Sequence, residues 1–156
     1  MKSFAFLFAL IFSNTSSAQQ YDADGFEIVN PGPSTEILEQ IDDEYQSQIE
    51  PFFKDKCLSC HSVNNNLPWY SVIPGVSHLL DYDMREAKAK MDMSKGFPFT
   101  GHGSPRDDLR ALSRVVGKDK MPPLRYQMMH WNSALTIHEK EVLNKWIDQS
   151  LSRLEN

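Results

Sequence analysis

The sequence contains only two cysteines, Cys57 and Cys60, and a histidine, His61, directly follows the second one. Two thiols exclude a framework of several disulfides, and alone they cannot supply a four-cysteine zinc or iron–sulfur site. The spacing Cys-x-x-Cys-His is the attachment pattern of a c-type haem. On a short helix both thiols reach the two vinyl groups of one porphyrin, and the adjacent imidazole lies under the iron. We therefore predict one haem c, covalently bound through Cys57 and Cys60, with His61 as proximal ligand.

Three other interpretations of the two cysteines are open. A thioredoxin-type redox pair requires a βαβ context, whereas this chain has helical patterns and no convincing strand pattern. A zinc site needs two further ligands at suitable spacing, and His130 and His138 lie eight residues apart, outside the usual finger spacing. A plain disulfide forms readily in an oxidising compartment. Export and an all-helical domain together favour haem over these three.

Residues 1–18 have the parts of a secretory signal peptide. Lys2 gives a positive start, Phe4–Phe12 is an unbroken run of nine apolar residues, and small residues precede the expected cleavage before Gln19. A membrane-spanning helix would need ~20 apolar residues. No cysteine follows the cleavage point, so no lipoprotein anchor is predicted. We expect a periplasmic or otherwise exported protein of 138 residues, the 156 of the chain less the 18 of the leader, without a membrane anchor.

The chain is acidic, which narrows the choice of partners. Its formal net charge is −5, and losing Lys2 with the leader makes it −6. Nucleic-acid binding depends on clustered Lys and Arg, so a nucleic-acid partner is not expected. We expect instead a redox partner protein with a basic docking surface, whose association weakens as salt is added.

The mature chain divides into a short arm and one domain. Residues 19–33 are polar and punctuated by Gly and Pro, which predicts a flexible arm or linker, and residues 34–156 form the haem-binding domain. Apolar residues every four positions predict the first helix of this domain: Ile37, Ile41, Tyr45 and Ile49. Pro51 is expected to end or kink that helix.

Three further helices are predicted. The second runs from Val76 to about Met91, the third from an N-cap at Ser104 to Gly117, and the last opens with a capping box. The capping box pairs Thr136 with Glu139, and Val142, Leu143, Trp146, Ile147 and Leu151 are the expected buried residues of its helix. The expected buried residues of the other two are Leu80, Met84, Ala87 and Met91, then Leu109, Leu112, Val115 and Val116. The predicted fold class is all-α.

A haem iron with His61 on one side needs a sixth ligand. Met121 stands in Lys-Met-Pro-Pro between two predicted helices, and the prolines restrict the backbone enough to hold a sulfur in one place. A thioether favours ferrous iron and raises the reduction potential. We predict Met121 as this ligand, with an ordinary loop methionine as the structural alternative. Other candidates stay open: Met128, Met129 and His130 close behind, and the weaker His78 and His102.

Three segments together resemble the bacterial haem-binding-domain family of single-haem c-type cytochromes: Pro51–Leu80, Lys120–His130 and Leu135–Ile147. The shared pattern is Cys-x-x-Cys-His closely followed by Pro-Trp-Tyr, then Met-Pro-Pro with a Tyr and a His downstream. The resemblance implies a small cytochrome c-like helical domain wrapped around one covalently attached haem. It also implies His61 and Met121 as the two axial ligands.

The resemblance also suggests roles for neighbouring residues. A ligating imidazole needs an acceptor for its other ring nitrogen, and we expect a backbone carbonyl near Pro68 or Ile73–Pro74. Trp69 and Tyr70 are predicted to pack on the haem or bond a propionate, or else to be core aromatics. Arg125 is a candidate propionate partner, with an exposed arginine as the alternative.

Three functions fit this pattern. A six-coordinate His/Met haem has no free site for a substrate, which favours a carrier of single electrons over an enzyme. A displaceable Met121 would instead suit a haem-based sensor or a peroxidase-like enzyme, with His102 or His130 as distal base. The third is a haem subunit of a larger oxidoreductase, with residues 19–33 as its tether.

Overall fold

The computed structural model describes residues 21, 23–26, 32–63, 67–101, 103–128 and 130–155. The predicted signal peptide lies outside the described residues, as does most of the predicted arm. Contacts divide the chain into two units, residues 1–32 and residues 33–156. The described residues of the first unit are exposed, and all of the elements below belong to the second.

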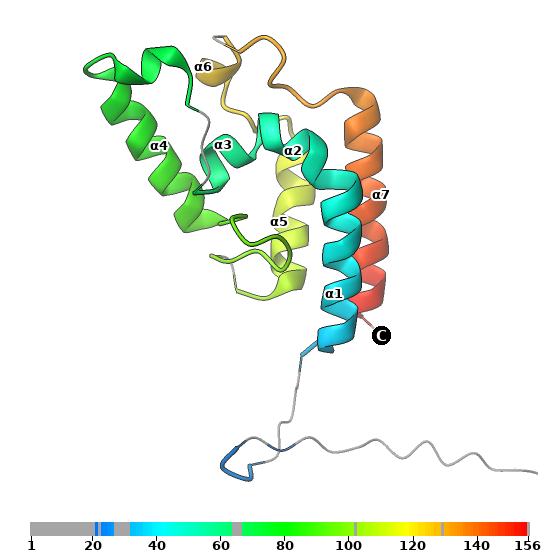
Figure 1. The fold of residues 1–156 in the computed structure, drawn as a ribbon. Helices are drawn as coiled ribbons and strands as arrows, with labels where there is room; N and C mark the ends of the chain where they lie inside the picture. Colours follow the sequence, from blue (N-terminus) through cyan, green and yellow to red (C-terminus); the bar gives the residue numbers. More distant parts are fainter. Residues whose placement is uncertain are drawn as a thin grey trace, which may run out of the picture. The chain divides into compact units, whose positions relative to one another are not determined.

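A long helical segment begins the second unit. It consists of α1 (Thr35–Glu44), a π-helical turn η1 (Tyr45–Ile49) and α2 (Glu50–Lys56). The four-residue spacing is confirmed, because Ile41, Tyr45 and Ile49 are buried and the stripe continues to Phe53. Pro51 does not end the helical segment, but the predicted kink is confirmed, because Figure 1 shows α2 leaving the line of α1. The widened π-turn ends two residues before Pro51 and accommodates the interruption.

Three elements follow α2 along the chain: α3 (Leu58–His61), the 3₁₀ turn η2 (Trp69–Val72) and α4 (Val76–Lys90). The second predicted helix is therefore confirmed, but its predicted buried face is wrong. Leu80, Met84 and Ala87 are only half-buried, and Met91, just beyond the helix, is the residue of that face that is buried. The physical reason is position: α4 packs mainly against α3 and η2, away from the other long helices (Figure 1).

The loop from Met91 to Gly103 folds back on α1. An isolated antiparallel bridge between Asp92 and Thr100 closes it, and Phe97 and Phe99 inside it are buried. The N–H of Phe97 donates to Oδ1 of Asp42 at 2.6 Å. Gly96, with φ of +81°, lies so close that a Cβ there would come within 2.5 Å of the same oxygen.

The remaining helices are α5 (Pro105–Gly117), the short α6 (Leu124–Gln127) and α7 (Ile137–Leu154). The predicted caps are confirmed: Ser104 Oγ accepts from the N–H of Asp107, and Thr136 and Glu139 form the reciprocal capping box. Short α6 was not predicted. In the domain, α7 packs against both α5 and α1 (Figure 1).

The core lies among α1, η1, α2, α5, α7 and the loop after α4. Its buried side chains are Ile41, Tyr45, Ile49, Phe53, Met91, Met93, Phe97, Phe99, Leu109, Ala111, Leu112, Val116, Leu143, Trp146 and Ile147. The described residues contain no named strand, so the predicted all-α class is confirmed. None of the described helices has the length and apolar character needed to cross a bilayer.

Candidate functional site

The two cysteines and the following histidine share one face of a short helix. Cys57 lies at the break between α2 and α3, with φ −125° and ψ −47°. Its carbonyl accepts hydrogen bonds from the N–H groups of Cys60, at 3.1 Å, and His61, at 3.0 Å. Residues three and four positions apart lie on the same side of such a turn, so both thiols and the imidazole face one way. This is the arrangement that attachment to one porphyrin requires.

Both cysteines are free, half-buried thiols. Burial raises the pKa of Cys57 to about 12, against an opposing effect of the Lys56 charge, and burial also raises the pKa of Cys60. The two thiols are therefore protonated at neutral pH. In the part of the chain that the structure describes, no three or more side chains of His, Cys, Asp or Glu are grouped as a metal ion would need.

The imidazole of His61 is oriented by the backbone. Its Nδ1–H donates to the carbonyl oxygen of Met91 at 2.7 Å, which leaves the lone pair on Nε2 available to a metal. Burial lowers the pKa of His61, so the ring is neutral at neutral pH. The expectation of an acceptor near Pro68 or Ile73–Pro74 is wrong. The acceptor is instead a carbonyl at the C-terminal end of α4, where helical carbonyls lack partners within the helix.

Met121 lies in the connection between α5 and α6, and its side chain is 43% exposed. The loop around it is held on both sides. Before it, the N–H of Lys120 donates to the carbonyl of Val115 at 3.2 Å, and after it, the amide of Gln127 donates to the carbonyl of Pro122 at 2.6 Å. These contacts fix the backbone near the thioether. The pairing of Met121 with His61 across one iron stays a prediction.

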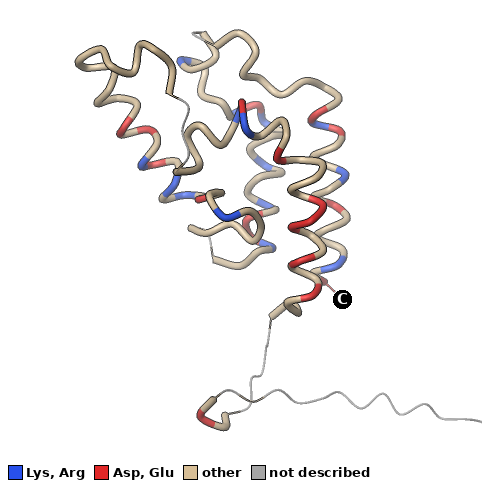
Figure 2. The backbone as a smooth tube through the Cα atoms, in the orientation of Figure 1, with Lys and Arg blue, Asp and Glu red and all other residues tan. Residues whose placement is uncertain are grey.

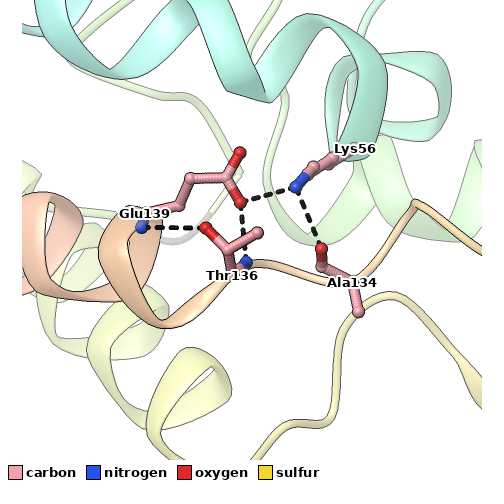
Figure 3. Close-up of polar contacts among 4 residues, drawn as sticks. All are labelled: Lys56, Ala134, Thr136 and Glu139. Atoms are coloured by element: carbon pink, nitrogen blue, oxygen red, sulfur yellow. Dashed lines mark hydrogen bonds and ion pairs between the residues drawn. The ribbon is translucent and has the colours of Figure 1, made fainter.

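Lys56, the residue just before Cys57, ties the attachment segment to the start of α7 (Figure 3). Its Nζ donates to Oε2 of Glu139 at 2.5 Å and to the carbonyl of Ala134 at 2.9 Å. The same Oε2 accepts the N–H of Thr136 at 2.7 Å. Sequence reasoning missed this contact because 83 residues separate Lys56 from Glu139, and no local pattern pairs them.

Tyr70 and His130, both candidates from the sequence, meet in the structure. The Tyr70 hydroxyl lies 2.7 Å from Nε2 and 3.1 Å from Nδ1 of His130, and Nδ1 lies 3.2 Å from the carbonyl oxygen of Tyr126. Because a carbonyl only accepts, we assign the proton to Nδ1, so that the Tyr70 hydroxyl donates to Nε2. The ring of Tyr126 stacks on His130, with centroids 4.0 Å apart, and its hydroxyl lies 3.5 Å from Oγ of Ser59 inside the attachment motif. His130 thus uses its nitrogen lone pair within the protein.

The other candidates are spread over the surface near α3. Trp69 is 80% exposed, so its alternative as a core aromatic is wrong, while Tyr70 is buried. Arg125 pairs with Asp83 of α4, with Nη2 and Oδ1 2.5 Å apart, and its side chain is largely exposed. His78 and Met128 are exposed. Met129 and His102 lie outside the described residues.

A cavity of about 730 Å³ opens on the other face of α3. Among the residues that line it are Leu58, Ser59, Ser62, Tyr126 and His130, whereas the two cysteines, His61 and Met121 do not. Because positions 58, 59 and 62 point away from positions 57, 60 and 61 on a helix, this cavity is distinct from the predicted haem site.

The residues present fit a covalently attached haem. Two protonated thiols and a neutral imidazole with a free Nε2 lone pair share one face of α3. Several large apolar side chains of η2, α4, α6 and the loop before α6 are exposed: Trp69, Val72, Leu79, Met121, Leu124 and Met128. Exposed apolar side chains of this size are available to cover a ligand or a partner. The site therefore supplies a metal ligand, two attachment points and apolar surface.

Comparisons with known proteins agree with this chemistry. The family model described as haem-binding domain matches residues 28–149. The chain is also similar to the cytochrome c peroxidase Ccp of Escherichia coli (strain K12), with 28% identity over 104 residues, which are 65% of this chain and 22% of that relative. The chain thus spans about a fifth of the length of this curated relative. No solved structure was found to match it.

Proposed function

Because the chain belongs to the haem-binding-domain family, we propose that it is a single-haem c-type cytochrome that carries electrons one at a time. The haem is attached through Cys57 and Cys60, with His61 and Met121 as axial ligands. The observation that carries this proposal is the hydrogen bond from His61 Nδ1 to the Met91 carbonyl at 2.7 Å. It presents Nε2 to a metal and fixes the ring, as second partners of ligating histidines do.

The protein's part in this function is to hold and tune the group. When bound, the haem supplies the reversible one-electron change of its iron. His61 keeps its Nδ1 proton on the Met91 carbonyl, which increases the basicity of Nε2. A more basic Nε2 favours oxidised iron, whereas the thioether of Met121 favours the reduced state. If His61 and Met121 both bind the iron, the chain would leave no position there for a substrate.

To test covalent attachment, the full chain is produced in a bacterial host whose periplasm contains the machinery that attaches haem to cysteines. A pyridine haemochrome spectrum and an intact mass are then recorded. We expect a c-type spectrum and the mass of the chain after residue 18 plus one haem, with no free thiol. A mass without haem, or a disulfide between Cys57 and Cys60, would overturn the proposal. The same mass tests export, because it reports whether the leader is removed before Gln19.

The partner that we propose is a redox protein with a basic docking surface. The support is charge: the chain has a formal net charge of −5, and Figure 2 marks several acidic positions along the backbone of α1, whose sequence is TEILEQIDDE. Complementary charges of this kind accelerate encounter and are screened by salt. Electron exchange with a basic acceptor protein should therefore slow as ionic strength rises. A rate that is independent of salt would contradict this part of the proposal.

Peroxide reduction is the second candidate, and the similarity to a cytochrome c peroxidase favours it. An enzyme of that kind must open the sixth position, so the reduced protein would bind carbon monoxide readily and consume hydrogen peroxide. The electron carrier would do neither until Met121 is removed. If the reduced protein binds carbon monoxide at once and Met121→Ala leaves the spectrum unchanged, the peroxidase is favoured and the sealed carrier is wrong.

A further inference from the structure

The contact between Lys56 and Glu139 is shielded from water. The side chain of Lys56 is 12% exposed and that of Glu139 is 19% exposed, so the attraction between them is weakened less than that of a surface pair. Oε2 of Glu139 accepts two hydrogen bonds, from Nζ of Lys56 and from the N–H of Thr136 (Figure 3). The ammonium group is therefore held at a defined place, between Glu139 and the carbonyl of Ala134 at the start of α7.

Lys56 connects the two segments that the iron is proposed to bridge. On one side it is bonded through the backbone to Cys57, the first attachment residue. On the other, its Nζ binds the carbonyl of Ala134, at the end of the connection from α5 to α7 that carries Met121. The start of this connection is also tied to α7, because Lys140 forms an ion pair with Asp119. A shift of α7 relative to α2 would thus move the Met121 loop relative to the cysteines.

We propose that Lys56 is a positioning residue that keeps the Met121 loop at the distance from the attachment segment at which the thioether stays on the iron. This inference rests on the proposed function and names the residue that maintains its sixth ligand. The competing explanation is that Lys56 only stabilises the fold. Breaking the contact distinguishes the two: positioning predicts loss of the sixth ligand in a folded protein, whereas the competing explanation predicts loss of stability alone.

The test compares Lys56→Gln with Lys54→Gln in the haem-loaded full chain. Lys54 lies on the same helix, 63% exposed, in a surface pair with Glu50, so its replacement removes the same charge without touching α7. The readouts are the affinity of the reduced protein for carbon monoxide and the near-infrared sulfur-to-iron band of the oxidised protein. We expect Lys56→Gln to raise the affinity roughly tenfold, the effect of losing one charged hydrogen bond, and to weaken the band. Lys54→Gln should change neither.

Two changes in α7 separate positioning from stability. Glu139→Gln removes the charge that Lys56 binds but keeps an amide able to complete the capping box, whereas Thr136→Ala removes the cap and keeps the ion pair. We expect Glu139→Gln to raise carbon monoxide affinity and Thr136→Ala to lower only the free energy of unfolding. In a protein that already carries Lys56→Gln, adding Glu139→Gln should change the carbon monoxide affinity little, because both changes remove the same contact. Lys56→Arg, which keeps the charge, should restore the band at least in part.

Three results would overturn the inference. One is equal carbon monoxide affinity in Lys56→Gln and Lys54→Gln. Another is a rise in carbon monoxide affinity in Thr136→Ala as large as that in Lys56→Gln. Such a result would make the rise a general effect of destabilisation. The third is a Met121→Ala spectrum identical to that of the unaltered protein, which is the failure of the proposed function itself. If Lys56→Gln does not accumulate, Glu139→Gln and Lys56→Arg decide the question by the same readouts.

Discussion

Tyr70 donates its hydroxyl proton to Nε2 of His130 at 2.7 Å, and this contact determines what His130 is able to do. The other ring nitrogen donates to the Tyr126 carbonyl, so the imidazole has no lone pair left for a metal. Burial raises the pKa of Tyr70, which keeps its hydroxyl protonated and able to donate. The sequence offers His130 as an alternative to Met121, and the hydrogen bonds favour a structural role for it instead.

This distinction predicts different outcomes for two variants. His130→Ala should leave the spectrum of the bound haem unchanged but lower the free energy of unfolding by about 1–3 kcal/mol, because the buried Tyr70 hydroxyl loses its acceptor. Met121→Ala should remove the sixth ligand; if Met121 is bound in about 99% of molecules, the apparent affinity for carbon monoxide rises about 100-fold. Optical titration measures the carbon monoxide affinity, and urea unfolding measures the free energy of unfolding. A spectral change in His130→Ala alone would make His130 the ligand.

The two thiols should differ in reactivity before haem is attached. The thiolate is the reactive form, and burial raises the pKa of Cys57 from 9.0 to about 12. At neutral pH this leaves ~1,000-fold less thiolate than in an unperturbed cysteine. Haem-free protein should therefore react slowly with iodoacetamide at Cys57 and faster at Cys60, as measured by peptide mass spectrometry. The same protein unfolded in urea is the control. If Cys57 reacts with iodoacetamide at equal rates with and without urea, the expectation is contradicted.

Local patterns in the sequence predicted the helix ends well. The caps at Ser104 and Thr136 were predicted correctly because a cap depends on residues within one turn of the chain. The apolar stripe of α1 also follows from spacing alone. The π-turn before Pro51 did not, since periodicity shows that a proline disturbs a helix but not how the helix accommodates it.

Contacts between distant segments were beyond the same reasoning. The spacing of Leu80, Met84 and Ala87 shows that they share a face, but what covers that face depends on where α4 packs. The acceptor of His61 is a backbone carbonyl, which has no sequence signature. The motif itself was visible in the sequence because its chemistry depends on five consecutive residues.

Glu139 should make the stability of the domain depend on pH. Burial acts to raise its pKa, but hydrogen bonds from Lys56 and Thr136 outweigh burial, so the folded pKa lies below the usual 4.5. A carboxyl group whose pKa falls on folding stabilises the native state above its unfolded pKa. That contribution is lost as pH falls through the lowered folded value.

We therefore expect Glu139→Gln to be less stable than the unaltered protein at neutral pH by about 1–2 kcal/mol, with the difference shrinking as pH falls below 4.5. Urea unfolding followed by circular dichroism at several pH values measures this. Glu141→Gln, at an exposed position of the same helix, is the control and should change stability by less than about 0.5 kcal/mol. A difference between Glu139→Gln and the unaltered protein that grows on acidification would contradict the assigned direction.

Asp42 should hold the loop after α4 against α1. Its Oδ1 accepts the N–H of Phe97, a residue that is 3% exposed, and its Oδ2 accepts from Gln46. Asp42→Ala leaves the buried N–H without an acceptor, so we expect a loss of about 1–3 kcal/mol in the free energy of unfolding. Asp42→Asn keeps an oxygen in place and should cost about 1 kcal/mol or less.

Because Met91 begins this loop and its carbonyl orients His61, Asp42→Ala should also weaken the protection of the His61 Nδ1 proton from exchange, as seen by NMR. Equal stability of the two variants would show that the loop is held by its buried phenylalanines instead.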